Sequence, residues 1–112
     1  MDLTLLNQND RLGITVEANR IDAQAALKFK DAVHTACNGA HSWVILELSK
    51  VDFVDSSGLG AIVSIKKHLG KDRRIDLASL EPAVEKVFRL RMDSVFRIYP
   101  SLAHAMADDI TA

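Results

Sequence analysis

Two adjacent serines, Ser56 and Ser57, stand between an aspartate and a glycine in the segment VDFVDSSGLGAIVSIKK, residues 51–67. An apolar run precedes them and a helical pattern follows them, so the pair falls where a strand gives way to a helix. In α/β sheets, functional groups gather at corners of this kind. The serines could therefore simply begin a helix, or one of them could be a chemical switch.

The simpler of these two interpretations is structural. Serine is a favoured N-cap of helices, and removing such a cap costs about 1 kcal/mol. On this interpretation Ser56 or Ser57 caps the helix, while Gly58 and Gly60 permit close approach of the backbone. Taken alone, the short motif favours this structural role.

Catalytic patterns do not fit the loop. A nucleophile elbow needs Gly-x-Ser-x-Gly, and neither serine has a glycine two positions before it. The four histidines are scattered, and none carries a sequence mark that pairs it with Ser56 as a general base. The positions are His34, His41, His68 and His104.

Cofactor and metal patterns are missing as well. The segment GLG lacks the third glycine of a dinucleotide fingerprint, and the Gly-Lys-Ser/Thr of a phosphate-binding P-loop is absent. No spacing of His, Cys, Asp or Glu indicates a metal site, and the lone Cys37 is typical of a small buried residue. The sequence therefore predicts no catalytic residue, no cofactor and no metal.

The bulk composition predicts one globular domain over residues 1–112. About half of the residues are apolar (48%), which is enough for a core, and the net charge of −1 gives no bulk attraction to nucleic acid. A single cysteine cannot form an internal disulfide and fits a reducing compartment. Neither a signal peptide nor an apolar run of roughly 20 residues appears. We therefore expect a soluble, cytoplasmic protein.

The elements that position the serine loop can be predicted from the periodicity of the apolar residues. Two short strands should flank a polar turn at residues 7–11, and Asp22 should cap a helix from Ala23 to about Cys37. The run WVILEL, residues 43–48, predicts a strand covered on both faces and central in its sheet. The apolar face of the first helix is assigned to Ala26, Leu27, Ala32, Val33 and Ala36.

After the serines we expect a second helix that ends at Gly70, a strand over residues 74–80 and a third helix from Pro82. A strand over residues 95–99 and a helix opened by Pro100-Ser101 and carrying Ile110 should follow. The order ββαβαβαβα predicts an α/β fold, with a mostly parallel mixed β-sheet and helices packed on it. The second helix should bury Leu59, Ile62 and Val63.

The chain resembles the STAS domain, the fold of bacterial anti-sigma factor antagonists. The family pattern has a buried strand, a Phe-x-Asp-Ser-Ser/Thr-Gly-Leu-Gly loop and an amphipathic helix, and later a Pro-x-Val-x-x-x-hydrophobic helix. The loop residues that match are Phe53, Asp55, Ser56, Ser57, Gly58, Leu59 and Gly60, and the helix residues are Pro82, Val84, Val87 and Phe88. Two features depart from the pattern: Asn19 replaces a usual glycine, and the exit of the third helix, RMDSVF, lacks one.

The resemblance implies that the protein is the substrate of a switch and not a catalyst. It implies that Ser56 is phosphorylated by a partner that is both serine kinase and anti-sigma factor, that phosphorylation releases this partner, and that a PP2C-type phosphatase restores the serine. Ser57 could cap the helix while Ser56 is the target. Partner contacts are assigned to Asp22, Asp55, Ser57, Gly58 and Gly60, although Asp22 could equally be a helix cap alone.

Other functions stay open at this point. The chain could be a non-switching STAS subunit of a lipid-transport or stress-signalling assembly, and a small enzyme using Ser56 is a weaker alternative because no base is identifiable. The basic run at residues 66–74 is interpreted as a solvated helix end and not as an RNA or membrane surface. We therefore expect neither a nucleic-acid nor a membrane partner.

Overall fold

The computed structural model describes residues 1–39, 41–91 and 95–108. It confirms the α/β fold and the predicted order of strands and helices, with two short strands added. The elements are β1 (Leu3–Gln8), β2 (Arg11–Val16), β3 (Arg20–Ile21), α1 (Ala26–Ala36), β4 (Trp43–Glu47), β5 (Phe53–Val54), α2 (Ser56–Leu69), β6 (Arg74–Ala78), α3 (Pro82–Arg91), β7 (Ile98–Tyr99) and α4 (Leu102–Ala107).

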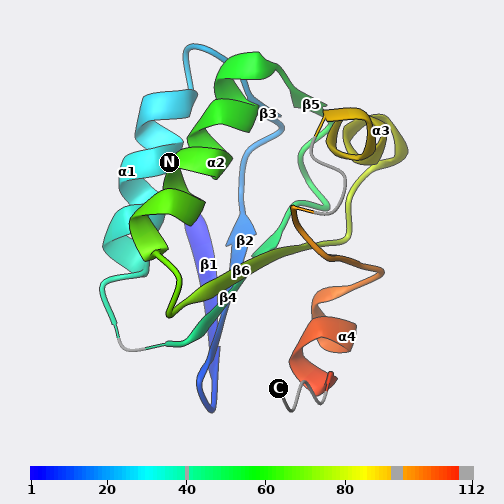
Figure 1. The fold of residues 1–112 in the computed structure, drawn as a ribbon. Coiled ribbons are helices and arrows are strands. Elements are labelled where there is room, and N and C mark those ends of the chain that lie inside the picture. The colour runs from blue at the N-terminus through cyan, green and yellow to red at the C-terminus, as the bar shows by residue number, and fades with distance from the viewer. Residues whose placement is uncertain (40, 92–94, 109–112) are drawn as a thin grey trace.

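Five strands form the main sheet in the order β1-β2-β4-β6-β7. β3 and β5 form a separate parallel pair (Figure 1). β1 runs antiparallel to β2, whereas the pairs β2–β4, β4–β6 and β6–β7 are parallel. β4 is the middle strand, which confirms the central position predicted from its apolar run. The carboxyl ends of the parallel strands therefore point to one edge of the sheet, from which the chain continues to the serine loop.

The larger core lies between the sheet and the pair of helices α1 and α2, which lie side by side in Figure 1. From α2, Leu59 and Ile62 are buried as predicted, whereas Val63 is only half-buried. The prediction for α1 was wrong at Leu27, whose exposed fraction is 63%. Val33 is buried as predicted, and Phe29, which was not assigned to this face, is the other buried residue of α1.

The opposite face of the sheet carries a smaller core beneath α4. It consists of Trp43, Ile45, Ala78, Tyr99 and Ala105. β6 is consequently buried on both faces, and the polar residue that alternates in its pattern, Asp76, is buried with an exposed fraction of 4%. α4 and the segment before it cover the face of β6 on which Asp76 lies, so the polar residue of this strand is buried as well.

The start of α1 and the length of β7 differ from the predictions. α1 begins three residues later than expected, since residues 23–25 form a turn, and β7 retains only two of the five predicted residues. Ser101 caps α4 as expected, because its side chain accepts a hydrogen bond from the His104 N–H at 3.1 Å. Ile110 and the middle of the predicted third-helix exit, residues 92–94, lie outside the described residues.

Candidate functional site: the serine loop

The serine loop, residues 53–60, is held by the small parallel pair of β3 and β5. Arg20 lies opposite Phe53, and Ile21 lies opposite Val54. The Asp55 N–H donates to the Ile21 carbonyl at 3.4 Å, which extends the pairing to the start of the loop. This pairing places Asp22, which follows β3, beside Asp55, which follows β5.

Asp55 is the N-cap of α2. Its Oδ1 accepts a hydrogen bond from the Gly58 N–H at 2.9 Å, and its Oδ2 accepts one from the Ala23 N–H at 3.0 Å. The prediction that Ser56 or Ser57 caps this helix was therefore wrong, because aspartate is as good a cap and the helix begins one residue earlier. Asp55 also ties the start of α2 to the turn before α1.

Asp22 caps the turn that leads into α1 and not the first residue of the helix. Its Oδ1 accepts from the Ala25 N–H at 3.1 Å, and its backbone carbonyl accepts from the Ala26 N–H at 2.8 Å. Its Oδ2 accepts from Arg20 Nε at 3.1 Å. The Ala25 hydrogen bond, with a smaller contribution from Arg20, lowers the pKa of the Asp22 carboxyl below its ordinary value and outweighs the opposing effect of partial desolvation.

The two serine side chains are left free by this arrangement. Ser56 is the first residue of α2, and both Ser56 and Ser57 are exposed. Within the described part of the chain, neither hydroxyl forms a hydrogen bond. Because the aspartate performs the capping, a change at either hydroxyl would not remove a support of the helix.

The two glycines of the loop have different roles. A Cβ atom at Gly58 would lie 2.0 Å from the Ile21 carbonyl oxygen, so only glycine fits between α2 and β3. A Cβ atom at Gly60 would meet no heavy atom within 4 Å. The predicted close approach is confirmed at Gly58 and is wrong at Gly60, whose Cα faces an open groove.

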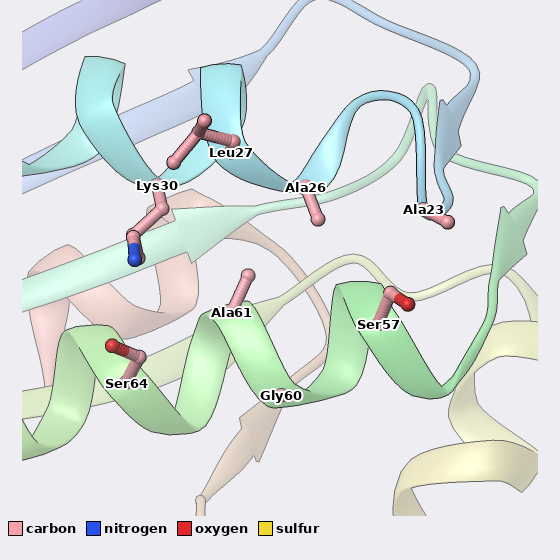
Figure 2. Close-up of a pocket in the computed structure, with 8 residues that line it drawn as sticks. All are labelled: Ala23, Ala26, Leu27, Lys30, Ser57, Gly60, Ala61 and Ser64. Atoms are coloured by element: carbon pink, nitrogen blue, oxygen red, sulfur yellow. The ribbon is translucent and has the colours of Figure 1, made fainter.

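That groove lies between α1 and α2 and encloses about 350 Å³ (Figure 2). Ala23 and Ser57 lie at one end, and Lys30 and Ser64 lie at the other. The remaining lining residues are Ala26, Leu27, Gly60 and Ala61. The small residues Ala26, Gly60 and Ala61 keep the groove open, and it begins directly beside the serine pair.

Phe53 is an exposed aromatic residue that the sequence reasoning did not single out as a surface group. Its exposed fraction is 42%, and the Arg20 guanidinium carbon lies 4.6 Å from the centre of its ring. Arg20 therefore contacts both the ring and the Asp22 carboxylate. A two-residue strand gives no alternation pattern, so no sequence signal distinguished the exposed Phe53 from the buried Val54.

The histidines lie elsewhere. His34 and His68 stack on each other between α1 and α2 with ring centres 4.2 Å apart, while His41 contacts Asn7 and His104 contacts Ser101. None of these four histidines, all of which the structure describes, forms a hydrogen bond with Ser56. In residues 1–39, 41–91 and 95–108, no group of three His, Cys, Asp or Glu residues is arranged to hold a metal ion. No helix in the same ranges is sufficiently long and apolar to cross a bilayer.

The basic run at residues 66–74 is only partly a solvated helix end. Lys67 and Lys71 are exposed, but Arg73 donates from Nε to the His41 carbonyl at 2.7 Å, and Arg74 forms an ion pair with the buried Asp76. The interpretation of a fully solvated run was therefore wrong for the two arginines, because the next strand, β6, begins at Arg74.

The sheet order, together with a serine pair at the start of a helix that an aspartate caps, defines a class of protein. The comparison with family models identifies this class. The STAS domain model matches residues 5–105, and the chain belongs to this family. The family predicted from the loop and the third helix is thus confirmed.

Solved structures agree with this assignment. A candidate anti-sigma factor antagonist from Thermotoga maritima is 28% identical, with a TM-score of 0.79 over 93% of this chain and 91% of that one. The anti-sigma factor antagonist SpoIIAA in its unphosphorylated form is 22% identical, with a TM-score of 0.75 over 94% and 93%. The Bacillus cell fate determinant SpoIIAA in its phosphorylated form is 21% identical, with a TM-score of 0.69 over 94% and 96%.

Proposed function

We propose that this chain is a phosphorylation-switched anti-sigma factor antagonist. The unmodified protein binds a partner that is both serine kinase and anti-sigma factor, phosphorylation of Ser56 releases that partner, and a PP2C-type phosphatase restores the serine. The family and the antagonists among its structural neighbours support this proposal. The observation that carries it is the Ser56 hydroxyl, which is exposed and has no structural task because Asp55 caps α2.

The position of Ser56 allows a phosphate without loss of the fold. A phosphoserine adds about 1.5 to 2 negative charges and three acceptor oxygens. At the first residue of α2, the helix dipole and the backbone N–H groups of the first turn favour an added anion. The modified side chain would extend into solvent, since Ser56 contributes nothing to the core.

The same phosphate would oppose partner binding. Asp55 directly precedes Ser56, and the β3–β5 pairing brings Asp22 to the same place. The phosphate would therefore add its negative charge to that of two carboxylates. Among the described residues, Arg20 is the cationic side chain that hydrogen-bonds to this pair of carboxylates. A kinase site holds phosphates and a carboxylate base of its own, and it would repel this charge. Burying the phosphate at an interface would also require its desolvation.

The unmodified loop offers a surface suited to a protein partner. The exposed ring of Phe53 precedes the serines, and the groove with Leu27 and Gly60 follows them. Aromatic residues are enriched in protein interfaces relative to the rest of the surface, and the core of an interface is mostly apolar. We assign partner contact to Asp22, Asp55, Ser57, Gly58 and Gly60 as well, with Gly58 acting through the shape of the loop.

The proposal is tested by intact-mass spectrometry with site mapping on the protein purified from cells that naturally produce it. We expect a phosphoryl adduct on Ser56 that disappears when a PP2C phosphatase is added. Ser57→Ala is the matched control and should retain the adduct, whereas Ser56→Ala should lose it.

The contrary result has an equally definite meaning. If no growth condition produces an adduct, and Ser56→Ala and Ser56→Asp both behave as wild type, Ser56 is not a switch. The chain would then be a non-switching STAS subunit of a larger assembly.

A further inference from the structure

β1 forms one edge of the five-stranded sheet and is the more exposed of its two edges. All of its six residues except Leu3 are exposed, and the exposed fractions of Leu5 and Leu6 are 46% and 43%. The other edge strand, β7, has only two residues, and one of them, Tyr99, is buried. The molecule therefore presents one long strand edge to solvent.

The register of β1 on β2 shows which of its backbone groups face outward. The Asp2 carbonyl accepts a hydrogen bond from the Glu17 N–H at 3.0 Å, one step beyond the pair of Leu3 and Val16. Hydrogen-bonded and non-bonded pairs alternate in an antiparallel ladder. The bonded positions of β1 are therefore Asp2, Thr4, Leu6 and Gln8, so the N–H and C=O groups of Leu3, Leu5 and Asn7 point away from the sheet.

β1 lacks the features by which proteins protect such an edge. Edge strands are usually blocked by charged residues, proline or a bulge. The sequence LTLLNQ contains no charged residue and no proline, and its pairing with β2 runs without a bulge from Leu3 to Gln8. Two copies of this strand can therefore meet without placing like charges opposite each other.

We propose that β1 is a self-association edge, which pairs antiparallel with β1 of a second copy about a two-fold axis at Leu5. In this register Leu5 lies opposite Leu5 of the second copy, Leu3 lies opposite Asn7 of the second copy, and Asn7 lies opposite its Leu3. These three pairs use every outward-facing position of β1, and each pair can exchange two hydrogen bonds. The contact is the same surface on both subunits, as a closed dimer requires.

The pairing would join the two sheets into one continuous sheet without covering the serine loops. Because the two β1 strands run antiparallel, the parallel strands of the two copies point in opposite directions, and the serine loops lie at opposite ends. Each copy thus stays able to bind its own partner. A six-residue strand pair buries less area than a standard interface, so the dimer is weak and concentration-dependent.

Sedimentation equilibrium tests the association at protein concentrations from about 1 µM to about 1 mM, the range in which weak dimers form. We expect the average mass of the wild type to rise toward that of a dimer. Leu5→Lys should raise the dissociation constant at least tenfold, because an edge lysine opposes strand pairing. Leu27→Lys, at an exposed leucine on α1, is the matched control and should leave it unchanged.

A cysteine substitution tests the register. Opposed Cα atoms of a hydrogen-bonded antiparallel pair lie about 5.5 Å apart, within the range that a disulfide spans. With oxidised glutathione as the oxidant, Leu5→Cys should therefore form an intermolecular disulfide at least ten times faster than Leu27→Cys, with the native Cys37 buried in both variants. A wild type that stays monomeric throughout, together with equal rates for the two cysteine variants, would overturn the proposal.

Discussion

Aspartates organise two regions of this molecule, the serine loop and the Asp76 cluster, in different ways. At the loop, Asp55 and Asp22 accept hydrogen bonds mainly from backbone N–H groups. The Asp76 cluster, formed by Trp43, Arg74, Asp76 and Arg97, lies under the α4 side of the sheet. There, Asp76 accepts from Trp43 Nε1 at 3.0 Å and from the Arg97 N–H at 2.7 Å, and it forms an ion pair with Arg74.

The comparison shows how a fold can keep exposed serine hydroxyls beside rigid structure. In the Asp76 cluster the Trp43 and Arg74 side chains both contact Asp76, and the guanidinium carbons of Arg74 and of the neighbouring Arg11 lie 4.7 and 4.6 Å from the Trp43 ring centre. At the loop the backbone is held in place by the two aspartates and by the close contact at Gly58. The hydroxyls of Ser56 and Ser57 form no hydrogen bond within the described residues. The atoms that stabilise the loop are thus distinct from the serine hydroxyl at which we propose the switch.

The largest effect is expected at Gly58. In Gly58→Ala the new Cβ would lie 2.0 Å from the Ile21 carbonyl oxygen, and backbone on both sides must shift to admit it. We expect the free energy of unfolding to fall by about 4 kcal/mol, as for other severe core substitutions. Urea denaturation measures this change.

Gly60→Ala is the matched control for that prediction. Its Cβ would meet open space, and alanine is favoured over glycine within a helix by roughly 0.5 to 1 kcal/mol. We expect the variant to be unchanged or slightly stabilised. Equal destabilisation of the two variants would show that the loop does not depend on the Gly58–Ile21 contact.

The next largest effect is expected in the Asp76 cluster. Asp76→Ala leaves the Trp43 Nε1–H and the Arg97 N–H without their acceptor and removes the partner of the half-buried Arg74. Loss of one member of a largely buried pair should lower the free energy of unfolding by about 3 kcal/mol. Asp72→Ala, at an exposed position four residues earlier, should change it by less than about 0.5 kcal/mol in the same urea titration.

Asp55→Ala should have an intermediate effect on stability. Removal of an N-cap costs about 1 to 2 kcal/mol, and this carboxylate also accepts from the Ala23 N–H. We therefore expect a loss of about 2 kcal/mol, and less than about 0.5 kcal/mol for Ser57→Ala, because the Ser57 hydroxyl has no bond to lose. Thermal unfolding followed by circular dichroism compares the two variants. A larger loss for Ser57→Ala would restore the serine as the cap.

The order of the elements along the chain and the central position of β4 could be predicted because long apolar patterns indicate them. Residues 43–48 show a nearly continuous apolar run, and β4 is the middle strand, covered on both faces. β3 and β5 were missed since two residues cannot show alternation, and only their pairing with each other defines them. Leu27 was assigned to the core because a helical stripe does not indicate which residues at its margin face the sheet.

The chemistry of the loop could be predicted only in part. The motif indicated the candidate site, but Asp55 and the serines are equally good caps, so the sequence could not choose between them. The distinct roles of Gly58 and Gly60 depend on the distance to Ile21, which is far away in sequence. The acidic cluster of Asp22 and Asp55 likewise exists only through the β3–β5 pairing.

Ser56→Asp separates switching from stability. The added carboxylate lies beside Asp55 at an exposed position, so we expect partner binding to weaken at least tenfold, equivalent to about 1.4 kcal/mol, with little change in the melting temperature. Calorimetric titration with the serine kinase partner measures the binding. A mimic that binds as well as wild type would remove the electrostatic mechanism, and because it carries less charge than phosphate, the phosphoprotein provides the confirming measurement.

The smallest effect concerns the pH dependence contributed by Asp22. Its pKa in the folded protein lies below the ordinary value of 3.8, chiefly because of the Ala25 hydrogen bond. A carboxyl with a lowered pKa stabilises the fold at pH values above its unfolded pKa, and this contribution is lost as the pH falls through the folded pKa. The melting temperature of wild type should therefore exceed that of Asp22→Asn at about pH 6, and the gap should close below about pH 4. A melting-temperature difference that stays constant down to about pH 2 would contradict this prediction. It would show that the protonated Asp22 side chain supports the turn before α1 as well as the carboxylate does, so that its charge does not contribute to the stability of the fold.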